Sequence, residues 1–232
     1  MNLIHLKNVP IFEQLQLEEA LLRCDRRNFF LINEGSEKAV VMGISGKKEE
    51  LVDEDKIQQD NLPLIKRYSG GGTVVVDEET IFTSFICEKK ISPSLNFPDD
   101  IMKWAAEFYR SSFQLPGFDL KENDFVIGDK KCGGNAQYLT KERFVQHTTF
   151  LYNFKEENMD YLLHPKKTPP YRQARAHKDF LCKLHPLLSK DSFINKIKQE
   201  LFRRYPITEL PLQEVLPLTQ LPHRKATSKT VG

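Results

Sequence analysis

Apolar residues recur at helical spacing in three stretches of the chain. The first, residues 11–23, sets leucines among acidic residues and predicts an amphipathic helix. The second follows Pro98, where we expect Asp99 to cap the helix. The third follows Asp191, which we expect to act as a cap in the same way. The positions expected to face inward are Leu15, Leu17, Leu21, Leu22, Ile101, Trp104, Ala105, Phe108, Ile194, Ile197 and Leu201.

Shorter apolar runs indicate β-strands. Residues 28–33 and 39–45 form two such runs, separated by a turn at 34–36. Residues 143–153 alternate with apolar side chains on both faces, which indicates a strand at least partly buried on both sides. Gly128–Asp129 separates two strand-like runs and predicts a hairpin. Because hairpins outnumber helical crossovers, the pattern favours a mixed α+β fold over a doubly wound parallel sheet.

Composition and charge exclude several classes of protein. The 232 residues are 40% hydrophobic and 28% charged, as in ordinary globular domains, and the formal net charge is +2. So small a charge argues against nucleic acid or an acidic membrane as the partner. No apolar run reaches the about 18 residues that a membrane helix needs. The first residues lack a signal or transit pattern, so we expect a cytoplasmic protein, or an organellar one if a longer precursor exists.

The cysteines and the final stretch bear on domain organisation. Four separated cysteines without a CxxC pair predict free thiols in a reducing compartment and no zinc site. We expect residues 1–207 to form a single domain. Residues 208–232 show little periodicity and are expected to be a partly disordered tail.

The stretch KRYSGGGTVVVD interrupts a strand with Gly70, Gly71 and Gly72. Consecutive glycines let backbone N–H groups wrap an anion, and they let a ligand approach the main chain. Ser69 adds a hydroxyl, and Arg67 adds a fork suited to carboxylate or phosphate. The stretch alone is equally typical of a glycine bulge that bends a sheet.

A second glycine cluster occurs in GDKKCGGNAQ. Lys131 lies just before two glycines, where its charge would stabilise an oxygen that becomes negative in a transition state. Alternation places Lys130 on the opposite face, so only one of the two lysines is expected in a cleft. Just upstream, Asp124 follows an asparagine; this pair would bind a metal or hydroxyl, although it is also typical of a turn.

In this order and spacing, the stretches KRYSGGGTVVVD, ENDFVIGDKKCGGNAQ and QHTTFLYN resemble the lipoate–protein ligase A family, and its short plant-type members in particular. The resemblance implies the biotin/lipoate ligase catalytic-domain fold, an α+β domain of mixed, largely antiparallel sheets flanked by helices. It implies ATP-dependent formation of lipoyl-AMP from lipoate, or of the octanoyl analogue, with Mg²⁺. The acyl group would then pass to a lysine of a lipoyl domain, in a 2-oxoacid dehydrogenase E2 subunit or the glycine cleavage H protein.

The resemblance also implies roles for single residues. Lys131 matches the lysine that contacts the acyl carbonyl and the α-phosphate, and Asp124 matches the aspartate near the nucleotide and magnesium. His147 matches the histidine of the H-x-T strand, and it is equally interpreted as a hydrogen-bonded core histidine. The remaining matches to the acyl-adenylate site are Arg67, Ser69, Gly70, Gly71, Gly72, Thr73, Gly134, Asn135 and Ala136.

The sequence departs from the family at two points. Val76 stands where the family has a histidine before Asp77. The final KTVG leaves no room for the small C-terminal domain of the long ligases, so we expect either a separate accessory protein or no activation by this chain. The strands around Val74–Val76 and Phe82–Phe85 would wall an acyl tunnel, and ordinary core packing is the better interpretation for most of them.

Three alternatives remain open on sequence. A lipoyl or octanoyl transferase would act through a cysteine thioester, for which Cys182 is a weak candidate, or from an acyl-adenylate made elsewhere. A noncatalytic protein would bind an acyl-adenylate or a lipoyl domain without chemistry. A biotin ligase is disfavoured because its G-R-G-R-x-G turn is absent. Arg172, Arg175 and His177 would dock an acidic domain or touch phosphate, although a solvated loop is the favoured interpretation.

Overall fold

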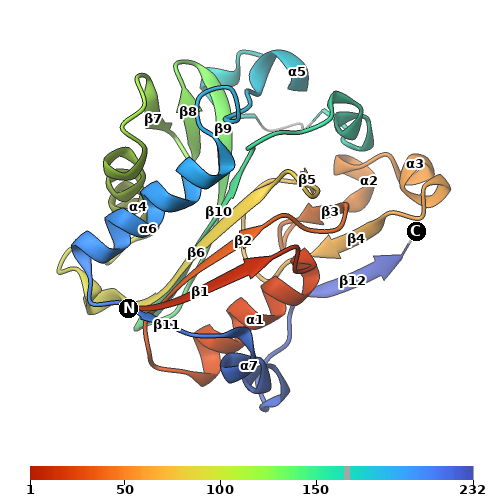
Figure 1. Ribbon diagram of the computed structural model, residues 1–232. Coiled ribbons are helices and arrows are strands. Elements are labelled where there is room, and N and C mark those ends of the chain that lie inside the picture. The colour runs from red at the N-terminus through yellow and green to blue at the C-terminus, as the bar shows by residue number, and fades with distance from the viewer. Residues whose placement is uncertain (165–167, 232) are drawn as a thin grey trace.

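The computed structural model describes residues 1–164 and 168–231. Two sheets form the framework (Figure 1). The larger has eight strands in the order β11-β1-β2-β6-β10-β9-β8-β7, and the smaller has four in the order β12-β4-β3-β5. Most neighbours are antiparallel, whereas β1–β11, β1–β2 and β3–β4 are parallel. The mixed α+β class expected from sequence is confirmed.

The bounds of the elements are as follows. The large sheet comprises β1 (Asn2–Lys7), β2 (Phe29–Glu34), β6 (Ile81–Glu88), β7 (Phe118–Lys121), β8 (Asp124–Ile127), β9 (Lys130–Leu139), β10 (Arg143–Phe150) and β11 (Thr208–Glu209). The small sheet comprises β3 (Ala39–Met42), β4 (Pro63–Lys66), β5 (Val74–Val76) and β12 (Ser228–Val231). The helices are α1 (Ile11–Cys24), α2 (Lys48–Leu51), α3 (Glu54–Gln59), α4 (Pro98–Phe113), α5 (His177–Phe180), α6 (Lys190–Arg204) and α7 (Leu212–Val215).

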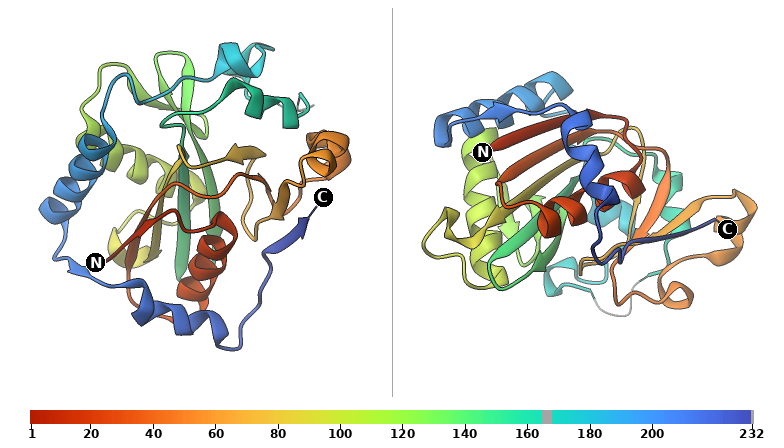
Figure 2. Two further views of the ribbon diagram at one scale, coloured as in Figure 1. Left: turned by 45° about the vertical axis from the view of Figure 1, so that its right-hand side comes forward. Right: turned by 90° about the horizontal axis from the view of Figure 1, so that it is seen from below.

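Side-chain alternation gives the large sheet two buried faces. In β2, Phe30 and Ile32 join the core cluster beneath α4 and α6, while Phe29 and Leu31 join the cluster that contains α1. This is the period-two pattern of a strand covered on both sides. Figures 1 and 2 show α4 and α6 together on one side of the large sheet and α1 on the other.

The three expected helices are present, but both of the expected caps are wrong. Pro98 occupies the first turn of α4, so Phe97 is the N-cap, and its backbone N–H donates to Asp100 at 3.0 Å. Asp99 therefore lies inside the first turn. In α6, Ser189 is the cap and its hydroxyl accepts from Ser192 N–H at 3.2 Å.

The final stretch differs from the disordered tail expected from sequence. β11 pairs with β1, and β12 pairs with β4. Between them, α7 buries Val215 completely in the α1-side core. Strand pairing at a sheet edge uses backbone groups, so weak side-chain periodicity did not reveal it. The division at residue 207 itself stays a prediction.

The fold leaves the four cysteines unpaired, as the sequence predicted. Across the described residues, helices that combine the length and the apolar character needed to cross a bilayer are not found.

Candidate functional site

The glycine turn links β4 to β5 and is closed by Arg67. Gly71 has φ +119°, and a Cβ there would lie 2.5 Å from Arg67 Nη2 and 3.0 Å from Asn135 O, so only glycine fits. Added Cβ atoms at Gly70 and Gly72 would meet no atom of the described residues within 4 Å. The turn is therefore tightly packed at its centre and open on either side.

Arg67 supports the turn from within. Its side chain is 5% exposed, and Nη2 donates to the carbonyls of Gly70 at 3.1 Å and Gly72 at 2.8 Å. Burial lowers the pKa of Arg67 to about 10, which still leaves it charged at neutral pH. The guanidinium fork expected to face an anion is thus occupied largely by the main chain of the turn.

Lys131 and Asp124 form an ion pair on neighbouring strands. A bulge between Phe125 and Val126 shifts the β8–β9 register, and Lys131 Nζ lies 2.8 Å from Asp124 Oδ1. Tyr171 donates its hydroxyl to the other carboxylate oxygen at 2.8 Å. Burial, together with the Asp124 charge, raises the pKa of Tyr171, which therefore stays a donor. Lys130 is exposed, as alternation predicted.

His147 belongs to a buried polar network rather than to this ion pair. Its Nδ1 lies 2.9 Å from Glu18 Oε1, and Ser84 donates to the same oxygen at 2.6 Å. Gln14 donates to it as well, at 2.8 Å. Burial alone would raise the pKa of Glu18, but His147, Ser84 and Gln14 together hold it below the ordinary value. Glu18 is a residue that sequence reasoning missed, because its position in α1 looks like ordinary helix surface.

The second glycine cluster contributes a wall and a hydrogen-bond anchor. Asn135 donates to Asn123 O at 2.9 Å, while its side-chain oxygen accepts from Gln146 at 2.8 Å and from Thr148 at 2.7 Å. These contacts use the amide to fix β9 against β10. Gly134 leaves room for Lys131, since a Cβ there would lie 3.2 Å from Lys131 Nζ.

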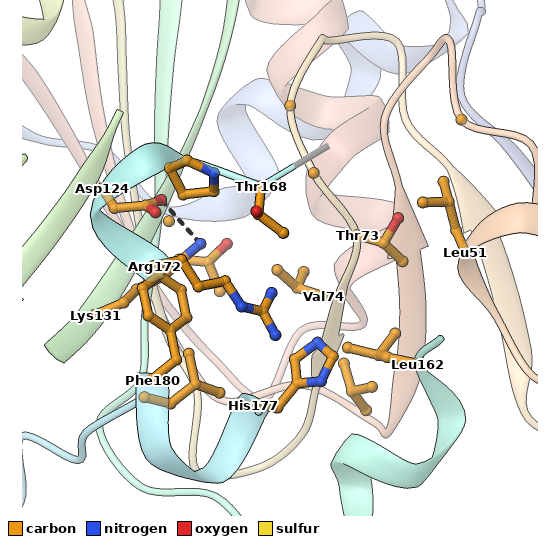
Figure 3. A pocket seen from close by; sticks show the side chains of 18 of the residues that line it. Leu51, Thr73, Val74, Asp124, Lys131, Leu162, Thr168, Arg172, His177 and Phe180 are labelled. Atoms are coloured by element: carbon orange, nitrogen blue, oxygen red, sulfur yellow. Dashed lines mark ion pairs between the residues drawn. The ribbon is translucent and has the colours of Figure 1, made fainter. Parts of the chain in front are cut away.

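Two adjoining cavities meet at these elements. The larger has a volume of about 770 Å³ and lies between the glycine turn, the Lys131–Asp124 pair and residues 168–181 (Figure 3). The smaller, about 160 Å³, extends beneath the turn. Its apolar wall is formed by Ile11, Leu15, Val41, Val74, Val76 and Phe82. Among the described residues, neither cavity has a cysteine in its lining.

The cavities gather most, though not all, of the site residues expected from sequence. Those lining both are Gly71, Gly72, Thr73, Asp124, Lys131 and Gly134. Those lining only the smaller are Arg67, Asn135, Ala136 and His147. Ser69 and Gly70 line neither cavity. Their expected roles in ligand binding stay predictions.

Arg172 corrects the interpretation of residues 169–180 as a solvated loop. Its side chain is 4% exposed, and Figure 3 shows its guanidinium pointing into the larger cavity. Nε donates to Arg175 O at 2.9 Å, while the buried Nη2 has no hydrogen-bond partner among the residues that the structure describes. The guanidinium also lies 5.0 Å from the centre of the Phe180 ring. This burial could not be predicted from the sequence, because residues 169–180 have no apolar periodicity.

His177 faces the same cavity in its neutral form. Burial, assisted by the charge of Arg172, lowers the pKa of His177 to about 4. At neutral pH its imidazole therefore offers a polar but uncharged ring beside the Arg172 cation.

Solved structures with the same fold define the class of domain. The crystal structure of a lipoate–protein ligase A bound with ATP superposes with a TM-score of 0.78 at 20% identity, over 94% of this chain and 92% of that one. A bipartite lipoate protein ligase from Thermoplasma acidophilum, studied with its E2 lipoyl domain, gives 0.77 at 20% identity, over 94% and 90%. These likenesses confirm a lipoate-ligase catalytic-domain fold.

Sequence comparison places the chain in a family. The lipoyl protein ligase A/B catalytic domain matches residues 10–205, and the chain belongs to that family. It is similar to the inactive lipoate–protein ligase 2 of Plasmodium falciparum, with 30% identity over 81% of this chain and 64% of that protein. The chain spans less than two thirds of the length of the first curated relatives that it matches.

Proposed function

We propose that the chain is a lipoate–protein ligase that joins lipoate or octanoate to AMP and transfers the acyl group to a lysine of a lipoyl domain. The observation that carries this proposal is the convergence of two cations on one cavity. Lys131 and Arg172 both face the larger cavity, which opens onto the apolar one. Among the described residues, Arg172 Nη2 has no hydrogen-bond partner. A buried N–H group without a partner costs free energy, so an anionic ligand is its expected complement.

Adenylation needs two anions brought together. An oxygen of the acyl carboxylate attacks the α-phosphorus of ATP, and the bond from that phosphorus to pyrophosphate breaks. Lys131 would hold the carboxylate and the α-phosphate, while Arg172 would offset charge on the phosphate chain. Because the two reactants supply nucleophile and electrophile, no protein nucleophile is required. This agrees with the cavity lining, which has no cysteine among the described residues.

The smaller cavity would hold the acyl chain. Val76, the departure from the family histidine, lies in its apolar wall with Phe82 and Leu15. An apolar lining suits a dithiolane ring or a plain octanoyl tail through burial alone. The sequence favoured core packing for most residues around Val74–Val76 and Phe82–Phe85. We propose that Val74, Val76 and Phe82 contact the substrate instead.

Magnesium would enter with the phosphates of ATP. Asp124 is the carboxylate proposed to meet it, although the structure has this side chain bound to Lys131 and Tyr171. The described residues include no group of three or more metal-binding side chains. A site with the single carboxylate of Asp124 fits Mg²⁺, which commonly binds one or two carboxylates plus substrate phosphates. The ion would supply charge neutralisation on the phosphate chain.

In the second half-reaction, the amine of an acceptor lysine attacks the acyl carbonyl and AMP leaves. The proposed acceptors are lipoyl domains of E2 subunits or the H protein, because a family structure from Thermoplasma acidophilum is described with its E2 lipoyl domain. We also propose a separate accessory protein as a partner. The cytoplasm is the proposed compartment, supported by the four free thiols.

The test mixes the purified chain with ATP, Mg²⁺, lipoate or octanoate, and an apo lipoyl domain. We expect acyl-AMP and a lipoyl domain whose mass rises by one acyl group. Lys131→Ala should slow the formation of both products about 100- to 1,000-fold, whereas Lys130→Ala, on the exposed face of the same strand, should leave it unchanged. Equal activity in the two variants would reject the role proposed for Lys131.

A second candidate is a protein that transfers or binds an acyl-adenylate without making it. The similar Plasmodium falciparum protein is called inactive, and the chain spans less than two thirds of its length. Supplying lipoyl-AMP separates the candidates. Transfer from lipoyl-AMP without any use of ATP would favour the second candidate, and binding without transfer would favour a noncatalytic role.

A further inference from the structure

Two thiols lie together beside the proposed catalytic lysine. Cys132 follows Lys131 in β9 and is fully buried, whereas Cys182 follows residues 168–181 and is half-buried. Lys131 and Leu181 form a parallel β-bridge, and Cys182 N–H donates to Lys131 O at 2.8 Å. Cys132 and Cys182 are therefore the next pair in register.

The spacing of this pair suits a disulfide. Neighbouring strands lie about 4.8 Å apart, within the Cα separation of about 4.4–6.8 Å that a disulfide needs. Cys182 Sγ donates to the backbone oxygen of Lys130 at 3.4 Å, so the thiol lies against the strand that carries Cys132. Formation of the bond would therefore need little movement of the backbone.

The surroundings give the two cysteines different roles. The neighbouring Cys132 thiol, partly offset by burial, lowers the pKa of Cys182. Burial raises the pKa of Cys132. The half-buried Cys182 is thus the thiol that reacts first as a thiolate, and Cys132 is the resolving thiol.

We propose that Cys132 and Cys182 form a reversible disulfide that fastens residues 168–181 to β9 and thereby slows exchange of ligands at the larger cavity. The effect on ligation rests on the proposed function, whereas formation of the bond does not. With oxidised glutathione as oxidant, the Cys182 thiolate attacks one glutathione sulfur and releases the first glutathione thiolate. Cys132 then attacks Cys182 Sγ, loses its proton and releases the second glutathione. Two protein thiols lose two electrons, and one glutathione disulfide gains them.

The disulfide would act on residues 168–181, the wall of the larger cavity to which Arg172 belongs. This wall is held to the β8–β9 hairpin by a few polar contacts, including Arg175 to Asp129 at 2.9 Å and Tyr171 to Asp124 at 2.8 Å. Polar contacts of this kind can open and close as ligands pass, whereas a covalent link cannot. Lys131 directly precedes Cys132, so the disulfide would form next to the proposed catalytic lysine.

The first experiment measures the bond itself. The full chain is equilibrated in glutathione buffers from reducing to oxidising, the remaining thiols are alkylated, and peptides are mapped by mass spectrometry. We expect a Cys132–Cys182 cross-link that a reducing phosphine reverses, with Cys24 and Cys87 still alkylated. A Cys182–glutathione adduct without cross-link, or cross-links to Cys24, would overturn the proposal.

The second experiment measures the consequence. Amide hydrogen exchange of residues 168–181 should slow on oxidation in the native chain, and oxidation should reduce ligation turnover. Cys182→Ser should lose both responses while keeping the activity of the reduced chain, and Cys24→Ser should keep both. If Cys182→Ser impairs folding, Cys132→Ala provides a second variant in which the same losses are expected.

The outcomes separate this inference from the proposed function. One outcome is a cross-link that slows hydrogen exchange in a chain that shows no ligase activity, reduced or oxidised. That outcome would reject the proposed function and support the disulfide. An active ligase that forms no cross-link would reject the disulfide. A cross-link that leaves both hydrogen exchange and turnover unchanged would reject its regulatory effect.

Discussion

Two acid–base pairs of similar geometry serve different purposes in this molecule. Lys131 and Asp124 are 2.8 Å apart with side-chain exposures of 20% and 13%, at the wall of the larger cavity. His147 and Glu18 are 2.9 Å apart with exposures of 6% and 0%. The distances alone do not distinguish the pairs, whereas the access to solvent does.

The difference shows which charges a ligand can reorganise. Asp124 has Lys131 and Tyr171 as partners, and an arriving phosphate would compete for both. Glu18 is fully buried and is hydrogen-bonded to three polar side chains. Replacing a member of the first pair should therefore change chemistry, and replacing a member of the second should change stability.

The largest effect on stability is expected from Glu18→Ala. The change leaves His147, Ser84 and Gln14 without their shared acceptor in the core. Loss of one partner from a buried pair costs about 3–5 kcal/mol of the free energy of unfolding, measured by urea denaturation. Glu13→Ala, on the exposed side of the same helix, should cost about 1 kcal/mol or less. Similar costs in the two variants would remove the distinction between the pairs.

Lys131→Ala should act in the opposite sense. We expect the rate of acyl-AMP formation to fall about 100- to 1,000-fold, the usual cost of removing one group that stabilises transition-state charge. The free energy of unfolding should change by about 1 kcal/mol or less, because the pair is partly solvated. Single-turnover kinetics and urea denaturation measure the two quantities. Lys130→Ala should match the native chain in both.

Arg172→Ala should weaken ATP binding by about 10- to 100-fold, because a charge-assisted hydrogen bond contributes about 1.5–3 kcal/mol. The measurement is a titration of ATP against the intact chain. Lys178→Ala removes an exposed cation from the same segment and should leave affinity unchanged. If both variants bind ATP as tightly as the native chain does, Arg172 does not bind the phosphates of ATP.

Gly71 lies where the two cavities meet and tests how rigid that junction is. Gly71→Ala places a methyl group against Arg67 and the Asn135 carbonyl at a positive φ, which should cost about 1–3 kcal/mol of unfolding free energy. Gly72→Ala enters open space and should cost less than half as much. Thermal denaturation of the two variants measures the contrast, and equal costs would contradict the observed packing.

The smallest effect concerns pH. The folded chain holds the pKa of Glu18 below its ordinary value of 4.5, so the ionised form contributes stability that is fully present above about pH 4.5. That contribution is lost as the pH falls through the lowered pKa. The stability difference between the native chain and Glu18→Gln should therefore be constant above pH 4.5 and shrink in more acidic buffer. A constant difference throughout would show that the Glu18 pKa is unshifted.

The sequence revealed the parts of the site that lie in short continuous motifs. The turn at Gly71 and the position of Lys131 opposite Lys130 follow from local rules of backbone freedom and strand alternation. Glu18 and Arg172 do not, because their burial arises from elements far apart in the chain. A glutamate on α1 and an arginine after two prolines have the local patterns of solvent-exposed residues.

The fold shows the same division between local and distant interactions. The three long helices and several of the strands follow from the periodicity, but Ser189 takes the place of the cap expected at Asp191 because α6 begins two residues earlier. The pairing of β12 with β4 could not be predicted, because backbone pairing at a sheet edge imposes little pattern on side chains.

The pairing of β12 with β4 also has a consequence for the order in which the site is built during synthesis. Residues 228–231 form the outer strand of the sheet that carries the glycine turn, so this sheet is incomplete until they have left the ribosome. A nascent chain can already contain residues 67–181 and still lack that support. Contacts so distant in sequence form late and slowly. The ligand cavities should therefore be among the last features to mature, which makes early termination costly even when every residue lining them has been translated.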